Sequence, residues 1–147
     1  MKILIADDDF TTRRLLQSYL EKWGHEVTAA KSGLEALELF ERGDYSFVVT
    51  DWSMPEGDGL ELITRIRSLP RAAYVYIVLV TARAQAEDVV QGIEAGADDF
   101  VAKPFDRDEL RARIRAGERI VTSLQVIADL RAQLQTALAR LDHVRDT

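Results

Sequence analysis

The sequence predicts an α/β fold, with a doubly wound sheet of five parallel strands and an extended helix at the C-terminal end. Short apolar runs rich in valine and isoleucine alternate with longer amphipathic stretches, which is the order of parallel strands joined by crossover helices. Three of these runs are apolar without interruption, as is typical of strands that are covered on both faces of a sheet. With 147 residues, 47% of them apolar, the chain has enough material to bury a core of its own.

Five segments are expected to form the strands because apolar and β-branched residues concentrate in them. They are Lys2–Ala6, Glu26–Ala30, Ser46–Thr50, Val75–Val80 and Asp99–Ala102. The segment Glu26–Ala30 is less apolar than the first, third and fourth segments, so we expect it at an edge of the sheet.

Helices are expected between the strands, where apolar residues recur at spacings of three and four. They are Thr11–Lys22, Leu34–Glu41, Leu60–Ser68 and Ala84–Ala95. A glycine or proline follows each of them, as is common where a helix ends. A fifth helix is expected after Pro104, with Asp106 as its N-cap.

The composition excludes several classes of protein. The chain has no cysteine, which excludes a disulfide framework, a zinc ribbon and a thiol nucleophile, and two histidines are too few for a histidine-rich metal site. The first apolar run ends at Asp7, which is too short for a secretory signal, and no run has the length that crosses a bilayer. We therefore expect a cytoplasmic protein that does not associate with membranes.

Charge is distributed unevenly along the chain. Residues 1–110 carry 12 basic and 21 acidic side chains, a balance of −9, whereas residues 111–147 carry 7 basic and 4 acidic side chains, a balance of +3. The acidic main part argues against direct binding of nucleic acid, which requires Lys and Arg to neutralise phosphates. We expect two parts, a domain over residues 1–117 and a C-terminal linker or coiled-coil helix over residues 118–147.

Polar residues follow four of the predicted strands. Asp7–Asp9 follow the first strand, Asp51 the third, Thr81 the fourth and Lys103 the fifth. In doubly wound sheets, ligand sites lie beyond the carboxyl ends of the strands, so these residues are expected to meet there. The capping of the first helix is the simplest role for Asp9.

Such a cluster points to phosphoryl chemistry. Crowded carboxylates repel one another unless a cation offsets their charge, and oxygen ligands with open water positions suit Mg²⁺. A carboxylate beside a divalent ion can attack phosphorus and form an acyl phosphate. Lys103 and the Thr81 hydroxyl would then contact the phosphoryl oxygens.

Five motifs, in order along the chain, resemble the receiver domain of bacterial two-component response regulators. They are Ile5–Asp9, Asp51–Gly59, Val80–Ala82, Gly96–Phe100 and Lys103–Phe105. The resemblance covers about residues 1–115 and implies a flavodoxin-like sheet with strand order 2-1-3-4-5. It also implies a phosphoacceptor signalling module, which catalyses only its own phosphorylation and dephosphorylation and is not an enzyme in the usual sense.

The resemblance assigns roles to the acidic residues. It implies that Asp51 accepts the phosphoryl group from a histidine kinase or a phosphotransfer protein. Mg²⁺, or Mn²⁺ in its place, would be bound by Asp8, Asp51 and the backbone carbonyl of Ser53, and by Asp7 through water.

The resemblance assigns the switch residues as well. Thr81 is similar to the family's switch hydroxyl, and Lys103 to its phosphoryl-binding lysine. Phe100 stands where the family has an aromatic side chain that turns inward when the hydroxyl moves to the phosphoryl group. The Lys103–Pro104 peptide is expected to be cis.

The C-terminal helix is expected to be longer than the domain needs, because Glu109–Arg145 contains no proline and only Gly117 interrupts good helix formers. Apolar residues recur in it at heptad spacing, with one extra step of three: Ile120, Leu124, Ile127, Leu130, Leu134, Ala137, Leu141 and Val144. We expect a parallel homodimer through this stripe and an output domain beyond this chain. Residues 115–120 are similar to the linker of receiver-coupled diguanylate cyclases. A helix folded back on its own domain is the alternative.

Two other functions are open at this point. Asp7-Asp8-Asp9-Phe10-Thr11 fits the nucleophile motif of haloacid-dehalogenase-type phosphatases, in which Asp7 would be the nucleophile and Asp9 the general acid. That hypothesis leaves Asp51 and the residues after it unexplained. The chain could also be a stand-alone adaptor with a monomeric tail.

Overall fold

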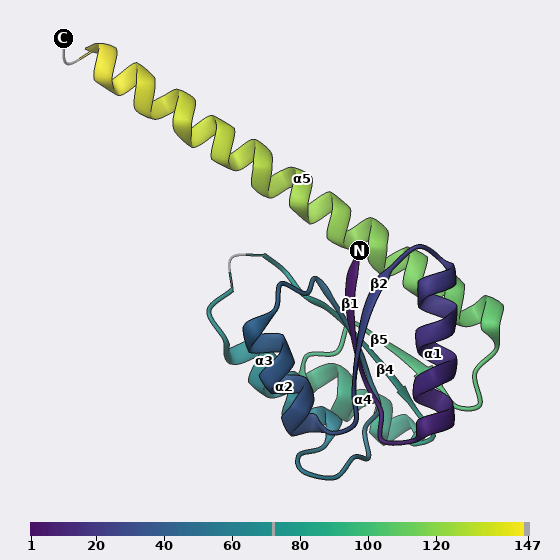
Figure 1. Cartoon of the computed structure of the whole chain (residues 1–147). Coiled ribbons are helices and arrows are strands. Elements are labelled where there is room, and N and C mark those ends of the chain that lie inside the picture. Colours follow the sequence, from purple (N-terminus) through teal and green to yellow (C-terminus); the bar gives the residue numbers. More distant parts are fainter. Residues whose placement is uncertain (72, 146–147) are drawn as a thin grey trace.

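The computed structural model describes residues 1–71 and 73–145 and has the predicted α/β fold (Figure 1). Its elements follow one another as β1 (Lys2–Ala6), α1 (Phe10–Lys22), β2 (Glu26–Ala30), α2 (Gly33–Arg42), β3 (Phe47–Thr50), α3 (Gly59–Ser68), β4 (Tyr76–Thr81), α4 (Ala86–Ala95), β5 (Asp99–Ala102) and α5 (Arg107–Arg145). The bounds of β1, β2 and β5 are those predicted, and the other bounds differ by at most two residues. Helix α4 begins two residues late because Gln85 and Asp88 form a capping box there.

The five strands form one parallel sheet in the order β2-β1-β3-β4-β5. The less apolar strand β2 lies at an edge, as predicted. The last residues of β1 and β3 are level with each other, as are those of β4 and β5, since Ala6 pairs with Thr50 and Thr81 pairs with Ala102. Strand β4 extends two residues beyond β3, because Thr50 pairs with Leu79. The chain therefore leaves β1, β3, β4 and β5 along one edge of the sheet.

Side chains that alternate along the strands build one core on each face of the sheet. Ile3 and Ile5 point to the face covered by α1 and α5, whereas Leu4 and Ala6 point to the face covered by α2, α3 and α4 (Figure 1). All four side chains are fully buried. Burial on both faces explains why the central strands carry uninterrupted apolar runs.

Helix α5 is continuous over 39 residues and crosses the expected boundary at residue 117 without a break. Its buried residues Leu110, Ile114 and Gly117 all lie in its first part. A Cβ atom on Gly117 would lie 2.6 Å from the rings of both Phe47 and Tyr76, so the helix backbone packs directly on the core here.

Beyond Gly117, the helix leaves the body of the domain (residues 1–117), and Val121 is the last of its residues that packs against the core. The buried ring of His25 lies against the carboxylate of Glu118 at this point. From Thr122 to Arg145 every residue is exposed, and the helix extends away from the sheet (Figure 1). We call residues 118–145 the projecting segment. Among the described residues, no helix is both long enough and apolar enough to cross a membrane.

Candidate functional site

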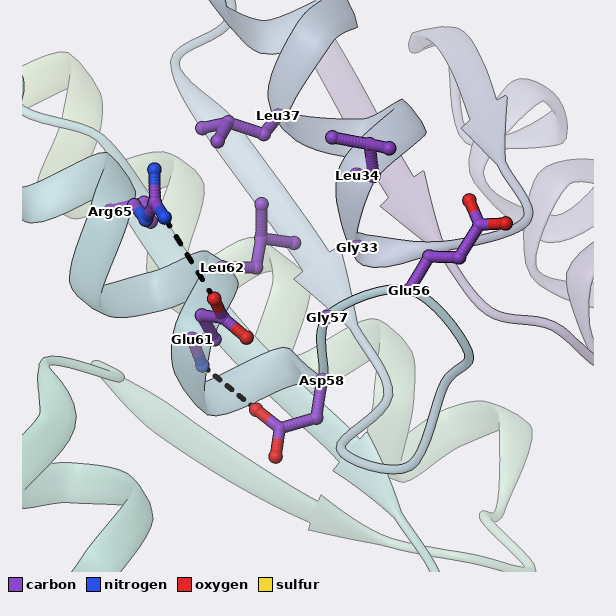
Figure 2. Close-up of a pocket in the computed structure, with 9 residues that line it drawn as sticks. All are labelled: Gly33, Leu34, Leu37, Glu56, Gly57, Asp58, Glu61, Leu62 and Arg65. Carbon is purple, nitrogen blue, oxygen red and sulfur yellow. Dashed lines mark hydrogen bonds and ion pairs between the residues drawn. The ribbon is translucent and has the colours of Figure 1, made fainter.

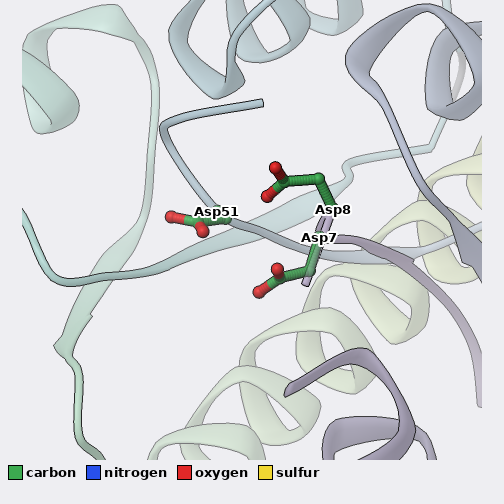
Figure 3. Close-up of side chains that lie close together, drawn as sticks. All are labelled: Asp7, Asp8 and Asp51. Atoms are coloured by element: carbon green, nitrogen blue, oxygen red, sulfur yellow. The ribbon is translucent and has the colours of Figure 1, made fainter. Parts of the chain in front are cut away.

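Three carboxylates meet at the edge of the sheet where β1 and β3 end (Figure 3). Asp7 follows β1 directly and Asp51 follows β3, and the amide of Asp51 donates to the carbonyl oxygen of Ala6 at 2.8 Å. One carboxylate oxygen from each of Asp7, Asp8 and Asp51 lies within 4.8 Å of the others. The backbone pairing of neighbouring strands thus brings together residues that are more than 40 positions apart.

Lys103 approaches the carboxylates from the other side of the sheet edge. Its Nζ atom donates to Oδ2 of Asp7 at 2.8 Å and to Oδ2 of Asp51 at 2.9 Å. Its backbone amide continues the β4–β5 pairing by donating to the carbonyl oxygen of Thr81 at 2.9 Å, and its peptide bond to Pro104 is cis. The ammonium group therefore bridges the two least exposed carboxylates.

Burial and pairing have opposite effects on these groups. Asp7 is fully buried, and the loss of solvation raises the pKa of its carboxyl group although Lys103 pulls it down. Burial by itself would lower the pKa of Lys103, but the hydrogen bonds to Asp7 and Asp51 outweigh it and raise that pKa. Lys103 is therefore a permanent cation at neutral pH.

The donor set fits a hard divalent cation. Asp8 is exposed and Asp51 is half-buried, so their carboxylates are open on the solvent side. The three carboxylates offer oxygen ligands, which Mg²⁺ prefers over nitrogen and sulfur. Three carboxylates against one ammonium group leave negative charge that such a cation would offset.

Asp9 does not belong to this cluster. Its side chain accepts hydrogen bonds from the amide of Thr12 at 3.0 Å and from the Thr12 hydroxyl at 2.6 Å, so it caps α1. These bonds lower the pKa of Asp9. The phosphatase hypothesis is not favoured, because its general acid would be this capping residue and its nucleophile would be the fully buried, lysine-paired Asp7.

Thr81 and Phe100 lie on the β4–β5 side of the site. Thr81 is the last residue of β4 and is 2% exposed, and its Oγ1 accepts a hydrogen bond from the amide of Arg83 at 3.2 Å. Phe100 is half-buried and packs towards α4, where a Cβ atom on Gly92 would lie 3.5 Å from its ring. Thr81 thus lies at the end of β4, and the Phe100 ring lies between β5 and α4.

The structure adds contacts near the site that the sequence did not predict. The Arg83 guanidinium stacks on the buried ring of Trp52, 4.1 Å from the ring centroid, and lies 3.3 Å from the Asp88 carboxylate. Arg13 donates to the backbone oxygen of Asp7 at 2.9 Å. The contact between Arg83 and Trp52 has no local sequence signal, because it joins residues 31 positions apart that only the fold brings together.

The loop after Asp51 is anchored to the neighbouring helix (Figure 2). The amide of Leu34 donates to the carbonyl oxygen of Glu56 at 2.9 Å, and a Cβ atom on Gly33 would lie 2.1 Å from the carbonyl oxygen of Gly57. A pocket of about 260 Å³ lies beside this contact, with leucines from α2 and α3 in its walls. The close packing against α2 fixes the loop that begins at Asp51.

Known proteins with similar sequences match the body of the domain. The family model of the response regulator receiver domain matches residues 3–115. The chemotaxis protein CheY-3 of Vibrio cholerae serotype O1 is 36% identical over 115 residues, which are 78% of this chain and 88% of that protein. The transcriptional regulatory protein SrrA of Staphylococcus aureus is 37% identical over 115 residues, which are 78% of this chain and 46% of SrrA.

Solved structures agree with these matches. The receiver domain of the Francisella response regulator 1452 aligns with a TM-score of 0.74 at 32% identity and covers 80% of this chain and 96% of that one. A CheY-like receiver domain protein from Methanospirillum hungatei aligns with a TM-score of 0.72 at 30% identity and covers 78% and 90%. The projecting segment lies beyond the residues that the family model matches.

Proposed function

The chain belongs to the response regulator receiver domain family, and we propose on this basis that Asp51 accepts a phosphoryl group from the phosphohistidine of a histidine kinase or phosphotransfer protein. Receiver domains are phosphoacceptor signalling modules and not enzymes in the usual sense. The observation that carries the proposal is the bridge from Lys103 Nζ to Asp7 and Asp51, at 2.8 and 2.9 Å, beside three converging carboxylates.

The transfer is a substitution at phosphorus. A carboxylate oxygen of Asp51 forms the new P–O bond while the P–N bond to the donor's imidazole breaks, and the electron pair of that bond leaves on the imidazole nitrogen. Lys103, held as a cation, stabilises the charge on the phosphoryl oxygens because its ammonium group already lies 2.9 Å from the acceptor carboxylate.

Asp8, Asp51 and the backbone carbonyl of Ser53 would bind Mg²⁺ or Mn²⁺, with Asp7 contributing through water. The bound cation would supply charge neutralisation at the phosphoryl oxygens. The exposed position of Asp8 supports this assignment, since its carboxylate is open to solvent within 4.8 Å of oxygens from the other two. Asp7 also carries a backbone role, because its Oδ1 accepts the amide of Asp9 at 2.9 Å and holds the turn after β1.

The phosphorylated state would be read through Thr81 and Phe100. The Thr81 hydroxyl would turn towards the phosphoryl group, and the Phe100 ring would take the space that this movement vacates. Phe100 lies on β5 directly after Asp99, whose Oδ1 is 3.4 Å from Arg113 Nη1 of α5. A movement of β5 would therefore be transmitted to α5 through this contact.

We further infer that α5 joins two copies of the chain and passes the switch on to an output domain. The chain spans less than half of SrrA, so a receiver of this kind is joined to a further region in that relative. The exposed apolar stripe of the projecting segment supports the dimer, because its leucines from Leu130 to Leu141 are between 51% and 60% exposed.

The phosphorylation is tested by incubating the chain with phosphoramidate, a small P–N phosphodonor, and Mg²⁺, and by measuring the intact mass. We expect the added mass of one phosphoryl group, its loss in Asp51→Asn, and its retention in Asp58→Asn, an exposed carboxylate in the same loop. No transfer when EDTA removes the divalent cation is also expected. A phosphoryl group on Asp7, or transfer that survives Asp51→Asn, would overturn the assignment.

The relay is tested separately by light scattering with and without beryllofluoride and Mg²⁺, with Asp51→Asn as the control that does not respond. A dimer in either state supports the proposal. A monomer in both states would refute the dimeric relay and favour a stand-alone adaptor.

A further inference from the structure

The projecting segment carries a row of apolar residues at strict seven-residue intervals. Ile120, Ile127, Leu134 and Leu141 form this row and are between 44% and 60% exposed. A repeat of seven keeps one face turned towards a second helix that supercoils around the first, whereas it drifts around a straight helix that packs on a flat surface. The row therefore predicts a helical partner.

Two further apolar rows flank this shared row, one on each side. Leu130 and Ala137 follow it at a spacing of three, and Leu124 and Leu138 follow it at a spacing of four. Leu138 did not belong to the predicted stripe, yet it is 51% exposed on the same side of the helix as Leu134 and Leu141. Either flanking row can combine with the shared row to form a complete heptad seam.

We propose that a second copy of this chain covers the projecting segment in two alternative seams that share the row Ile120–Leu141. In the first seam the partner packs on the flank of Leu130 and Ala137, and in the second on the flank of Leu124 and Leu138. The proposal rests on the dimeric relay and adds its regulation: the switch in the body selects the seam.

A second copy is the occupant that the pattern itself specifies. In a parallel two-fold pair each residue meets its own counterpart, so every apolar row of one helix faces an identical apolar row of the other. Helix α5 extends away from the body beyond Gly117 (Figure 1), and every residue from Thr122 to Arg145 is exposed. Val121 still packs against the core, and Leu124 and Ile127 line a small pocket together with Tyr74 of the body. The part of the stripe from Leu130 to Leu141 is therefore the part that a second copy can cover.

The two seams are closely matched because neither uses all of the apolar residues. Near the body, the second seam contains Leu124 where the first seam contains Ser123, so this heptad favours the second seam. One heptad later, Leu130 favours the first seam, since the second would bring two Arg131 side chains together. In the next heptad Leu138 favours the second seam over the smaller Ala137. This alternation means that a small change at the start of the helix can decide between the seams.

The exchange is a rotation of each helix about its own axis. At 3.5 residues per turn, the flanking rows lie about 50° to either side of the shared row, so the seam centre moves by about 50°. The body can impose this rotation because Gly117 packs on the Phe47 and Tyr76 rings and His25 lies against Glu118. These contacts fix the orientation of the helix at the point where it leaves the body.

Single cysteines test the two seams directly, because the chain has none of its own. Ala137→Cys reports the first seam, Leu138→Cys the second, Leu134→Cys the shared row, and Ala139→Cys the outer face. Each variant is oxidised with and without beryllofluoride and Mg²⁺, and the rate at which disulfide-linked dimers form is measured on gels. The same variants carrying Asp51→Asn serve as controls that do not respond to beryllofluoride.

We expect Leu134→Cys to cross-link in both states and Ala139→Cys in neither. The ratio of the rates at positions 137 and 138 should change by roughly fivefold or more on activation, the lower end of ordinary allosteric coupling. An unchanged ratio, or a tetramer in which both positions cross-link in either state, would overturn the two seams and leave the dimeric relay intact. A monomer with no cross-link at position 134 would instead refute the relay itself.

Discussion

The body and the projecting segment are built on opposite principles. In the body, strands such as β1 bury Leu4 and its neighbours completely, and the charge that collects there is acidic. In the projecting segment every apolar residue from Leu124 onwards is exposed, and residues 118–145 carry 4 basic and 3 acidic side chains, so they are almost neutral. The body therefore holds its own fold and site together, whereas the segment has an apolar face that only another helix can cover.

A matched pair of leucine truncations gives the largest expected difference between the two regions. Leu4→Ala leaves a cavity at a fully buried position of β1 and should destabilise the chain by about 2–5 kcal/mol. Leu134→Ala removes the same atoms from an exposed position and should leave the unfolding of the body unchanged. Urea unfolding, monitored by the fluorescence of Trp23 and Trp52, which both lie in the body, measures both variants.

The association of two chains should rank the same two variants in the opposite order. Leu134→Ala should weaken the association of two chains, because it removes a side chain from the shared row, while folded Leu4→Ala chains should associate normally. If Leu134→Ala destabilised the body as much as Leu4→Ala, the segment would have to fold back on its own domain, which is the alternative the sequence left open.

Gly117 marks the joint between the two regions and gives the next largest effect. Ala is a better helix former than Gly by about 1 kcal/mol, so Gly117→Ala would stabilise a free helix. Here the new Cβ atom would lie 2.6 Å from the Phe47 and Tyr76 rings, and we expect a net destabilisation of about 1–3 kcal/mol. Ser123→Ala, which also changes a residue of α5 to alanine but at an exposed position, is the control. A stabilised Gly117→Ala variant would mean that the helix lifts easily from the core.

The two regions also differ in how far the sequence alone predicts them. In the body, the apolar runs predicted the strands, and the residues after them predicted which side chains meet at the sheet edge. Asp9 shows why local reasoning succeeds there, since an N-cap acts only on the next three residues. The stacking of Arg83 on Trp52 had no such signal, because it joins residues 31 positions apart that only the packing of the loops brings together.

In the projecting segment, the sequence predicted a helix and an apolar stripe but described the stripe incompletely. The predicted stripe contained Ala137 and omitted Leu138, because a search for periodicity selects one residue at each step along the helix and ignores a second row beside it. The exposure of Leu124 and Leu138 beside Leu134 shows that the apolar face is wider than one seam. Which part of that face a partner covers depends on a second chain and is not a property of one sequence read alone.

Arg131 is a charged residue of the projecting segment that should affect the association of two chains but not the stability of the body. In the second seam two Arg131 side chains would face each other, so Arg131→Leu should strengthen that seam and tighten the dimer by roughly tenfold in dissociation constant. The unfolding of the body should not change. Light scattering over a dilution series measures the association, and Arg140→Leu, which lies outside both seams, is the control. An equal effect of the two variants would mean that general hydrophobicity, and not the seam, controls association.

The smallest expected effect concerns Asp7, a buried residue that lowers the stability of the body. It is an exception to the contrast between a body that is stable by itself and a segment that needs a partner. The pKa of Asp7 is raised above 3.8 chiefly by burial, so the folded state favours its protonated form. The contribution of that form is fully present below 3.8 and is lost as the pH rises through the folded-state pKa. Asp7→Asn, which stays neutral, should therefore gain stability relative to the unsubstituted chain between about pH 3.5 and pH 7, measured by urea unfolding at both values. If the variant instead lost stability over that interval, the ion pair with Lys103 would outweigh the burial of Asp7. The acidic site would then stabilise the fold, whereas the raised pKa of Asp7 implies that its ionised carboxylate lowers the stability of the body.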